Sequence, residues 1–391
     1  MGLISLMMLW ACTADDEGAE TPAFEQGMPI ALSASAVRYQ DAEDVAANRR
    51  SWTPPSGYSL YSSLYDDNGN HYVNFSNANL TNKSIDAFFT MDAEPNPYHG
   101  QLRYMSTDDT WRLSIKKVDP EDVTAGDYYV YGFIPSNAAD DATIALLPEK
   151  TSYTAGAKLT IKGLRTAGYD ACVIIGAKEG PDADHDNGLV AGDFKFNLKT
   201  GESVKNYLYL LFDHLCSAVS IGIKIDGDYN TLRTIKLKEM TLQTATESGL
   251  MAEKADVVVD LVANTMGINP ISGLSYGTTD KGASVYLSDE GLTLTTSYQS
   301  FLSHFLPITG VTKVVITCVY DVYDKDTSLN PAGNLVRKDC KAINTVRLSD
   351  IISYFPGVQR GWKYGINMTV MPTYLYVLSD PDLDNPTVVV N

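Results

Sequence analysis

The chain has 391 residues, of which 44% are hydrophobic and 20% charged, which is the ordinary range of globular proteins and leaves room for two or three domains. Its 30 basic and 48 acidic residues give a formal net charge of −18. Nucleic-acid-binding proteins need a basic patch, and because no cluster of Lys and Arg supplies one, this class is excluded.

The chain begins with an apolar stretch that stops at a cysteine. Leu3 to Ala11 is too short for a membrane span, which needs about 20 apolar residues, and suits the core of a signal peptide. Leu9-Trp10-Ala11-Cys12 has the apolar, variable, small, cysteine order of a bacterial lipobox. We therefore predict a lipoprotein signal segment over residues 1–12, with the lipid on Cys12. The alternative is an apolar N-terminus with an incidental cysteine.

Residues 13–50 are predicted to form a tether that contains one strand. The sequence is acidic and rich in small residues up to about Gly27, as expected of a linker. From Ile30 to Val37, larger apolar residues alternate with small and polar ones, which predicts a half-buried strand. The next stretch is polar, reaches Arg49 and Arg50 and is predicted to be an exposed loop.

Residues 51–202 are predicted to form an N-terminal β-sandwich domain, because short strands recur between Gly, Asn, Asp and Pro. Ala171 to Ala177 is a continuous apolar run, which predicts a strand covered on both faces. Tyr128, Tyr129 and Tyr131 could stack on sugars, but alternating tyrosines in a strand are typical of packing.

Residues 203–372 are predicted to form a second β-sandwich domain. We place the boundary after a loop rich in Asp and Gly, and Tyr207 to Ile225 is a strand-rich stretch able to seed a new core. A possible helical turn or two lies around Asn206 to Leu215. Trp362 to Val370 alternates and predicts a closing strand.

The clearest hairpin joins Lys313–Tyr323 to Leu335–Leu348. A pairing symmetric about Leu329 places Cys318 opposite Cys340. Directly opposed Cβ atoms lie about 4.5–5.5 Å apart, which is slightly more than the mean Cβ–Cβ distance in a disulfide. The sequence therefore leaves two possibilities, two buried thiols or a strained disulfide bond.

The remaining cysteines and histidines predict no metal site and no cofactor. Cys172, Cys216, Cys318 and Cys340 form no CxxC pair and have no His at ligand spacing, so zinc is not predicted. The five histidines form no cluster, and His214, in an apolar strand, is interpreted as a satisfied core or boundary residue.

Two motifs match chemical sites only in part. Gly273 to Gly277 has the G-x-S-x-G spacing around Ser275, with His304 downstream, but the stretch carries no helix signal, and a Gly-rich turn is favoured. A calcium loop is suggested by four acidic positions, in which the glycine and the last ligand depart from the EF-hand pattern, so a solvated turn is favoured. These positions are Asp182, Asp184, Asp186 and Asp193. We predict no catalytic residue and no enzyme activity.

Residues 373–391 form a tail in which two apolar stretches, 374–378 and 387–390, flank a polar linker over residues 379–386. The tail has no later partner strand in its own chain. The pattern of this tail predicts that it pairs with another strand. The residues that would face that partner are Tyr374, Tyr376, Leu378, Val388 and Val390.

In this order, the parts resemble the fimbrillin (Mfa-like) family, the subunits of the type V pili of Bacteroidales. The resemblance covers nearly the whole chain and rests on five features. They are the lipobox, the early strand followed by an Arg-containing loop, Trp111 with Gly126–Pro135, the Phe-Asp-His-Leu-Cys-Ser-Ala-Val-Ser-Ile stretch from Phe212, and the Trp362–Val370 strand.

The resemblance implies an all-β protein of two transthyretin-like β-sandwich domains in tandem, made as an outer membrane lipoprotein precursor. It further implies that an Arg-specific, trypsin-like protease cuts at Arg49 or Arg50 and removes the N-terminal strand. By donor-strand exchange, the tail of a neighbouring subunit would then fill the groove that this strand leaves.

The function expected from the resemblance is that of a structural pilin. The mature chain would lie in a cell-surface fimbria, as a homopolymer or with other pilins, and support adhesion to a host or bacterial surface receptor. The alternative is an outer membrane lipoprotein that binds glycan or protein without polymerising, or the anchor or tip subunit of the pilus.

Overall fold

The computed structural model describes most of the chain between residues 27 and 370. The described ranges are 27–37, 40–41, 72–75, 84–92, 97–165, 169–180, 191–201, 205–247, 249–250, 252–265, 268–281, 284–306, 311–325, 334–351 and 358–370. They consist mainly of strands with a few short helices, so the prediction of an all-β protein is confirmed. The finer assignment of two tandem transthyretin-like domains stays a prediction.

The first half of the fold is built on one large sheet in the order β10-β12-β1-β6-β5-β4-β7-β11, with β3 added beside β1. Strand β10 also pairs with β7, through Cys172–Ile134 and Val173–Phe133, so the sheet closes on itself. Its strands are β1 Met28–Val37, β3 Tyr72–Phe75, β4 Ser84–Thr90, β5 Tyr98–Met105, β6 Thr110–Ile115, β7 Gly126–Ile134, β10 Cys172–Glu179, β11 Lys195–Leu198 and β12 Asn206–His214.

A four-stranded sheet, β17-β16-β9-β8, shares its core with the closed sheet. Its strands are β8 Asp141–Leu146, β9 Gly156–Arg165, β16 Ala252–Val262 and β17 Ile271–Lys281. One hydrophobic cluster includes Leu159 and Val257 from this sheet together with Phe133 and Leu210 from the closed sheet. Residues Cys172 to Ala177 of β10 are all buried, which confirms that this apolar run is covered on both faces.

The first core extends well beyond residue 203, where we placed the domain boundary. Strand β12 pairs with β1 and β10, and β16 pairs with β9, so residues 206–214 and 252–281 complete the first core rather than the second. Residues 206–214 are a regular strand, so the suggested helical turn was wrong. Its nearly continuous apolar sequence is explained by burial on both faces, which removes the alternation that marks a half-exposed strand.

The second core lies between two further sheets, β19-β13-β22-β2 and β15-β14-β20-β21 with β18 beside β14. Their elements are β2 Gln40–Asp41, β13 Ser217–Ile225, α3 Gly227–Leu232, β14 Arg233–Thr246, β15 Gly249–Leu250, β18 Ser284–Thr293, β19 Gln299–Leu306, β20 Lys313–Asp324, β21 Asn334–Arg347, α4 Leu348–Ile351 and β22 Trp362–Val370. Ile221 and Tyr364 from one sheet meet Leu242 and Ile316 from the other.

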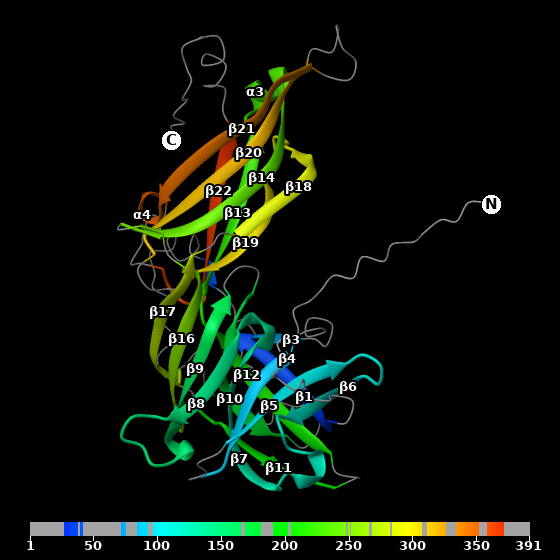
Figure 1. The fold of residues 1–391 in the computed structure, drawn as a ribbon, viewed down its shortest axis with the longest axis vertical. Helices are drawn as coiled ribbons and strands as arrows, with labels where there is room; N and C mark the ends of the chain where they lie inside the picture. The colour runs from blue at the N-terminus through cyan, green and yellow to red at the C-terminus, as the bar shows by residue number, and fades with distance from the viewer. Residues whose placement is uncertain are drawn as a thin grey trace, which may run out of the picture.

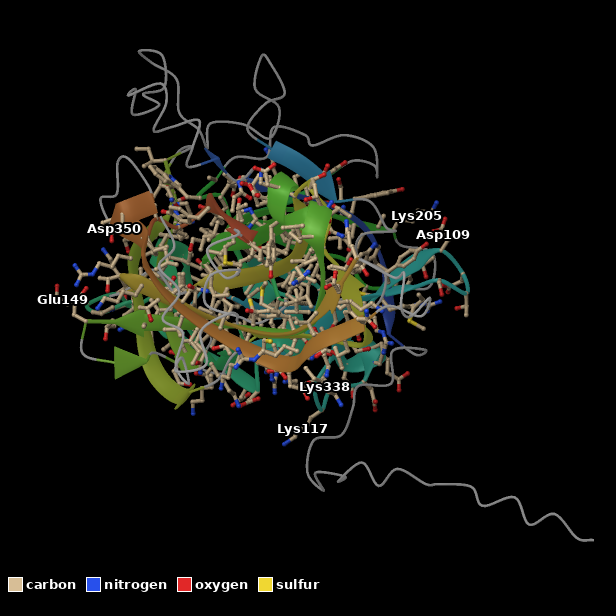
Figure 2. The ribbon with its side chains drawn as sticks, turned by 90° about the horizontal axis from the view of Figure 1, so that it is seen from above. Asp109, Lys117, Glu149, Lys205, Lys338 and Asp350 are labelled. Carbon is tan, nitrogen blue, oxygen red and sulfur yellow. The ribbon has the colours of Figure 1, made fainter. Side chains whose placement is uncertain are left out.

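The two cores are stacked along the long axis of an elongated molecule, with β16 and β17 beside the junction (Figure 1). Charged side chains lie at its periphery. Figure 2 shows this for Asp109, Lys117, Glu149, Lys205, Lys338 and Asp350, all of which are exposed. Within the described ranges, no helix has the length and apolar character needed to cross a bilayer.

The β20–β21 hairpin is present, but its register differs from the predicted one. Next to the loop, Asp324 pairs with Asn334 and Tyr323 with Leu335, as a pairing symmetric about Leu329 requires. Two irregularities, between Tyr320 and Tyr323, then shift the register by two residues. Cys318 therefore opposes Ala342 and Cys340 opposes Tyr320, so the predicted opposition of the two cysteines was wrong, and both are free thiols.

Candidate functional site

Strand β1 lies in the interior of the closed sheet. On one side Ile30 to Ala36 run parallel to Asn206–Phe212 of β12. On the other side its first half is antiparallel to β6 and its second half to β3. Because β1 has partners along both edges, its removal would leave unpaired backbone groups on β12 and on β6.

The side chains of β1 fill space on both faces of the sheet. Ile30 is buried in the first half, whereas Ala31, Leu32 and Ser33 are all partly exposed, so the predicted alternation is not found there. In the second half Ala34, Ser35, Ala36 and Val37 are all buried, so both faces are covered there. The strand we predicted to be half-buried is therefore half-buried only over its first residues. The small side chains at positions 34–36 fit a strand that is enclosed on both faces.

Both ends of β1 are held by side chains from other elements. Arg112 donates from Nη1 to the carbonyl oxygen of Gly27 at 3.2 Å. At the other end, His214 Nε2 lies 2.7 Å from the carbonyl oxygen of Val37. A carbonyl oxygen only accepts, so Nε2 carries a proton and donates. His214 is 4% exposed and hydrogen-bonded, which agrees with the predicted satisfied core or boundary residue and places it in the core.

The N-terminal segment also reaches the second core. Residues 40–41 form β2, which pairs in parallel with Trp362 and Lys363 of β22. Cleavage at Arg49 or Arg50, as predicted, would therefore leave both an interior strand of the first core and an edge strand of the second on the released fragment. Sequence reasoning missed β2, since two paired residues leave no periodic signal.

The turn between β12 and β13 fastens the two cores together beside the end of β1. Arg360, which precedes β22, forms an ion pair with Asp213 and donates from Nη1 to the His214 carbonyl oxygen at 3.0 Å. Gly361 donates its backbone N–H to the Cys216 carbonyl oxygen at 3.1 Å, and the Tyr276 hydroxyl donates to the Leu215 carbonyl oxygen. This turn belongs to the sequence stretch from Phe212 on which the family resemblance partly rests.

Asp170, Cys172 and His214 meet at the same place. Their ligand-type atoms, one from each side chain, all lie within 4.8 Å of one another. Burial raises the pKa of the Cys172 thiol well above its ordinary value, and the Asp170 and Asp213 carboxylates act in the same direction. Burial is the largest single influence on the pKa of His214 and lowers it, but the hydrogen bond and charge of Asp170, the charge of Asp213 and the hydrogen bond to Val37 together raise this pKa overall. Sequence spacing could not find this cluster, because its cysteine and histidine come from two strands 42 residues apart.

The residues predicted to act in export and assembly lie outside the described part of the chain. These are Cys12, Arg49, Arg50, Tyr374, Tyr376, Leu378, Val388 and Val390. The same holds for Asp182, Asp184 and Asp186 of the suggested calcium loop. Asp193 is described, and its Oδ1 accepts the backbone N–H of Lys195 at 3.2 Å.

The two remaining sequence motifs are structural. The G-x-S-x-G match runs through the middle of β17, where Ser275 pairs with Val258 of β16 and is exposed, so it does not form the strand-turn-helix of a nucleophile elbow. The Gly-rich turn favoured for this stretch was wrong, because the stretch is a paired strand. Tyr128 and Tyr131 are buried, with hydroxyls that donate to the carbonyl oxygens of Thr124 and Tyr153, which confirms the packing interpretation.

Comparisons with known proteins give likenesses among solved structures alone. No family model matches the chain, and no curated protein matches its sequence. A fimbrial protein from Bacteroides vulgatus is 14% identical, with a TM-score of 0.32, over 76% of this chain and 91% of that one. A candidate cell adhesion protein from Bacteroides eggerthii is 10% identical, with a TM-score of 0.32, over 95% of this chain and 94% of that one. At these identities and TM-scores, the likeness assigns neither a family nor a function to this chain.

Proposed function

We propose that this chain is a structural subunit of a cell-surface fimbria, exported as an outer membrane lipoprotein and polymerised by donor-strand exchange. The observation that carries the proposal is the position of β1, an interior strand close to the start of the chain whose removal opens a closed sheet. A strand added to such an opening satisfies the backbone groups and fills the apolar pockets together.

The tail of another copy is the strand that the sequence offers for this opening. Two stretches of this tail, 374–378 and 387–390, are apolar and rich in aromatic or β-branched side chains, as a strand that replaces β1 would need to be, and a polar linker over residues 379–386 separates them. Pairing of one subunit's tail with the next subunit's groove is heterologous, so it extends into a filament rather than closing into a dimer. Fimbriae of this kind would support adhesion, and a mature subunit would begin at Arg50 or Ser51.

The proposal is tested by limited trypsin cleavage of the purified chain. We expect cleavage after Arg49 or Arg50, followed by a ladder of oligomers that resist SDS. A chain that ends at residue 372 should be cleaved in the same way and stay monomeric, because it has no donor strand. The double variant Arg49→Gln/Arg50→Gln should keep β1 and give no ladder.

A ladder from the truncated chain would overturn the proposed role of the tail. Cleavage without any ladder from the full chain would overturn polymerisation by this route and favour the alternative function, a lipoprotein that binds glycan or protein at the cell surface without polymerising. Retention of residues 13–50 on the protein taken from cells would favour the same alternative.

A further inference from the structure

We propose that Asp170, Cys172 and His214 form a binding site for a zinc ion, with a water molecule as the fourth ligand. The three side chains lie beside the end of β1, but the inference does not depend on the proposed function. It rests on the geometry of three side chains, on the hydrogen bond that orients the histidine, and on the path by which an ion can enter.

The three ligand atoms have nearly the separations of a tetrahedral site. His214 Nδ1 lies 3.3 Å from Cys172 Sγ and 2.8 Å from Asp170 Oδ1, and Sγ lies 3.7 Å from the same Oδ1. Zinc bond lengths of about 2.0–2.3 Å to N, O and S place tetrahedral ligands about 3.3–3.6 Å apart. The Nδ1–Oδ1 pair must therefore open by about half an ångström, and a small rotation of the Asp170 side chain, 36% exposed, provides this.

The histidine is oriented as a metal ligand. Nε2 donates to the Val37 carbonyl oxygen at 2.7 Å, which leaves the Nδ1 lone pair of the neutral ring directed at Cys172 and Asp170. Metal-binding histidines almost always donate their other ring N–H to a carbonyl or carboxylate in this way, which fixes the tautomer and the ring.

The backbone at Cys172 and His214 is held by hydrogen bonds between strands. Cys172 and His214 are directly paired across β10 and β12, and the Leu215 N–H donates to the Ala171 carbonyl oxygen at 2.8 Å. Cys172 is 1% exposed, so the thiol and the imidazole form the floor of the site, while the carboxylate reaches solvent and provides the entrance.

The donor set selects the kind of ion. One sulfur, one imidazole nitrogen and one carboxylate oxygen suit a borderline-soft divalent cation such as zinc, whereas calcium and magnesium prefer oxygen ligands alone. Three protein ligands leave one tetrahedral position for water. Binding must release the thiol proton. With Cys172 as thiolate, the two anionic ligands balance the charge of the ion, and Asp213 remains neutralised by Arg360.

The site would tie the end of β1 to the sheet. His214 would bind the ion through Nδ1 while it holds the Val37 carbonyl oxygen through Nε2. Any ion that binds the folded state and not the unfolded state stabilises the folded state. Bound zinc should therefore slow the loss of β1 as well as hold β10 and β12 together.

The test is a titration of the full, tag-free, reduced chain with zinc chloride, followed by competition with a chromophoric chelator. We expect one zinc ion per chain. Asp170→Asn keeps the shape of a partly exposed side chain and should weaken binding at least tenfold, on the order of the losses seen when groups around metal sites are changed. Asp350→Asn removes an exposed carboxylate at the periphery in Figure 2 and should leave binding unchanged.

Cobalt(II) supplies a second readout that reports the sulfur ligand. The wild-type chain should show a thiolate-to-cobalt charge-transfer absorption, which Cys172→Ser removes. Cys318→Ser, which changes a buried thiol in β20, should keep it. Failure of zinc to bind at micromolar concentration would overturn the site. His214 would then be a protonated ring that donates to the Val37 carbonyl oxygen and to Asp170 Oδ1. Binding that survives both Asp170→Asn and Cys172→Ser would overturn it too.

Discussion

At the scale of single residues, the ion pair of Arg360 with Asp213 is one of the contacts that join the two cores. Asp213 is 2% exposed, and Arg360 also reaches the His214 carbonyl oxygen. Replacing Arg360 by Gln leaves a buried carboxylate without its counter-charge, and breaking a buried pair in this way costs about 3–5 kcal/mol. In urea unfolding, we expect Arg360→Gln to lower the free energy of unfolding by an amount at the lower end of this range, since the Arg360 side chain is partly exposed.

An exposed ion pair in the same chain provides the control. Arg165 and Asp140 lie 2.6 Å apart, and both side chains are more than 40% exposed. Exposed pairs contribute about 0–1 kcal/mol, so Arg165→Gln should change the unfolding free energy little. If the two variants were equally stable, the junction between the cores would not depend on the buried pair.

Tyr131 tests whether the tyrosine run serves packing. Its ring lies 4.6 Å from that of Phe194, and its hydroxyl donates to the Tyr153 carbonyl oxygen at 2.7 Å inside the core. Tyr131→Phe keeps the ring and removes the donor, so thermal or urea unfolding should show a loss of about 1 kcal/mol. Tyr129→Phe, at a half-buried position, should fall within about 0.5 kcal/mol of the wild type. A larger loss for Tyr129 than for Tyr131 would contradict the packing interpretation.

Residue-level prediction succeeded where the local sequence determines the environment. The apolar neighbours of His214 indicated burial, and burial is found. The contact of His214 with Cys172 and Asp170 could not be predicted, because it depends on which strands pair, and nothing in the sequence around either residue specifies that β10 and β12 are neighbours.

At the scale of elements, β1 should behave as an interior strand. In native-state hydrogen exchange, the amides of residues 34–36 should be protected as strongly as those of β12, because these residues have a partner strand on each edge, as β12 does. β21 pairs with β20 alone in the described sheet, so half of its amides should exchange faster. Exchange of β1 as fast as that of β21 would mean that β1 is not an integral part of the closed sheet.

Several strands could be predicted from the sequence, whereas their partners could not. Local patterns of apolar and aromatic residues located β7, β10, β20, β21 and β22. The predicted register of the β20–β21 hairpin was wrong by two residues at the cysteines, because the two irregularities that shift the pairing have no signature in the amino-acid composition. The pairing of β16 with β9, almost a hundred residues apart, moved the limit of the first core to residue 281.

At the scale of the whole molecule, net charge should govern the rate of assembly. Loss of residues 1–50 removes eight acidic and three basic residues, so the net charge changes from −18 to −13. Cleaved subunits would still repel one another, and salt screens this repulsion, with a Debye length of about 8 Å at about 0.15 M. Oligomer ladders should therefore form faster at about 0.15 M salt than at about 0.01 M. A rate that falls with added salt would contradict an assembly opposed by like charge.

The most direct test of strand removal and exchange is the N-terminal residue and mass of the protein purified from its native cell surface, measured before and after trypsin. We expect a mature chain that begins at Arg50 or Ser51, together with SDS-resistant oligomers. A chain that keeps a lipidated Cys12 and β1, and stays monomeric after trypsin, would show that β1 is not replaced by the tail of another subunit.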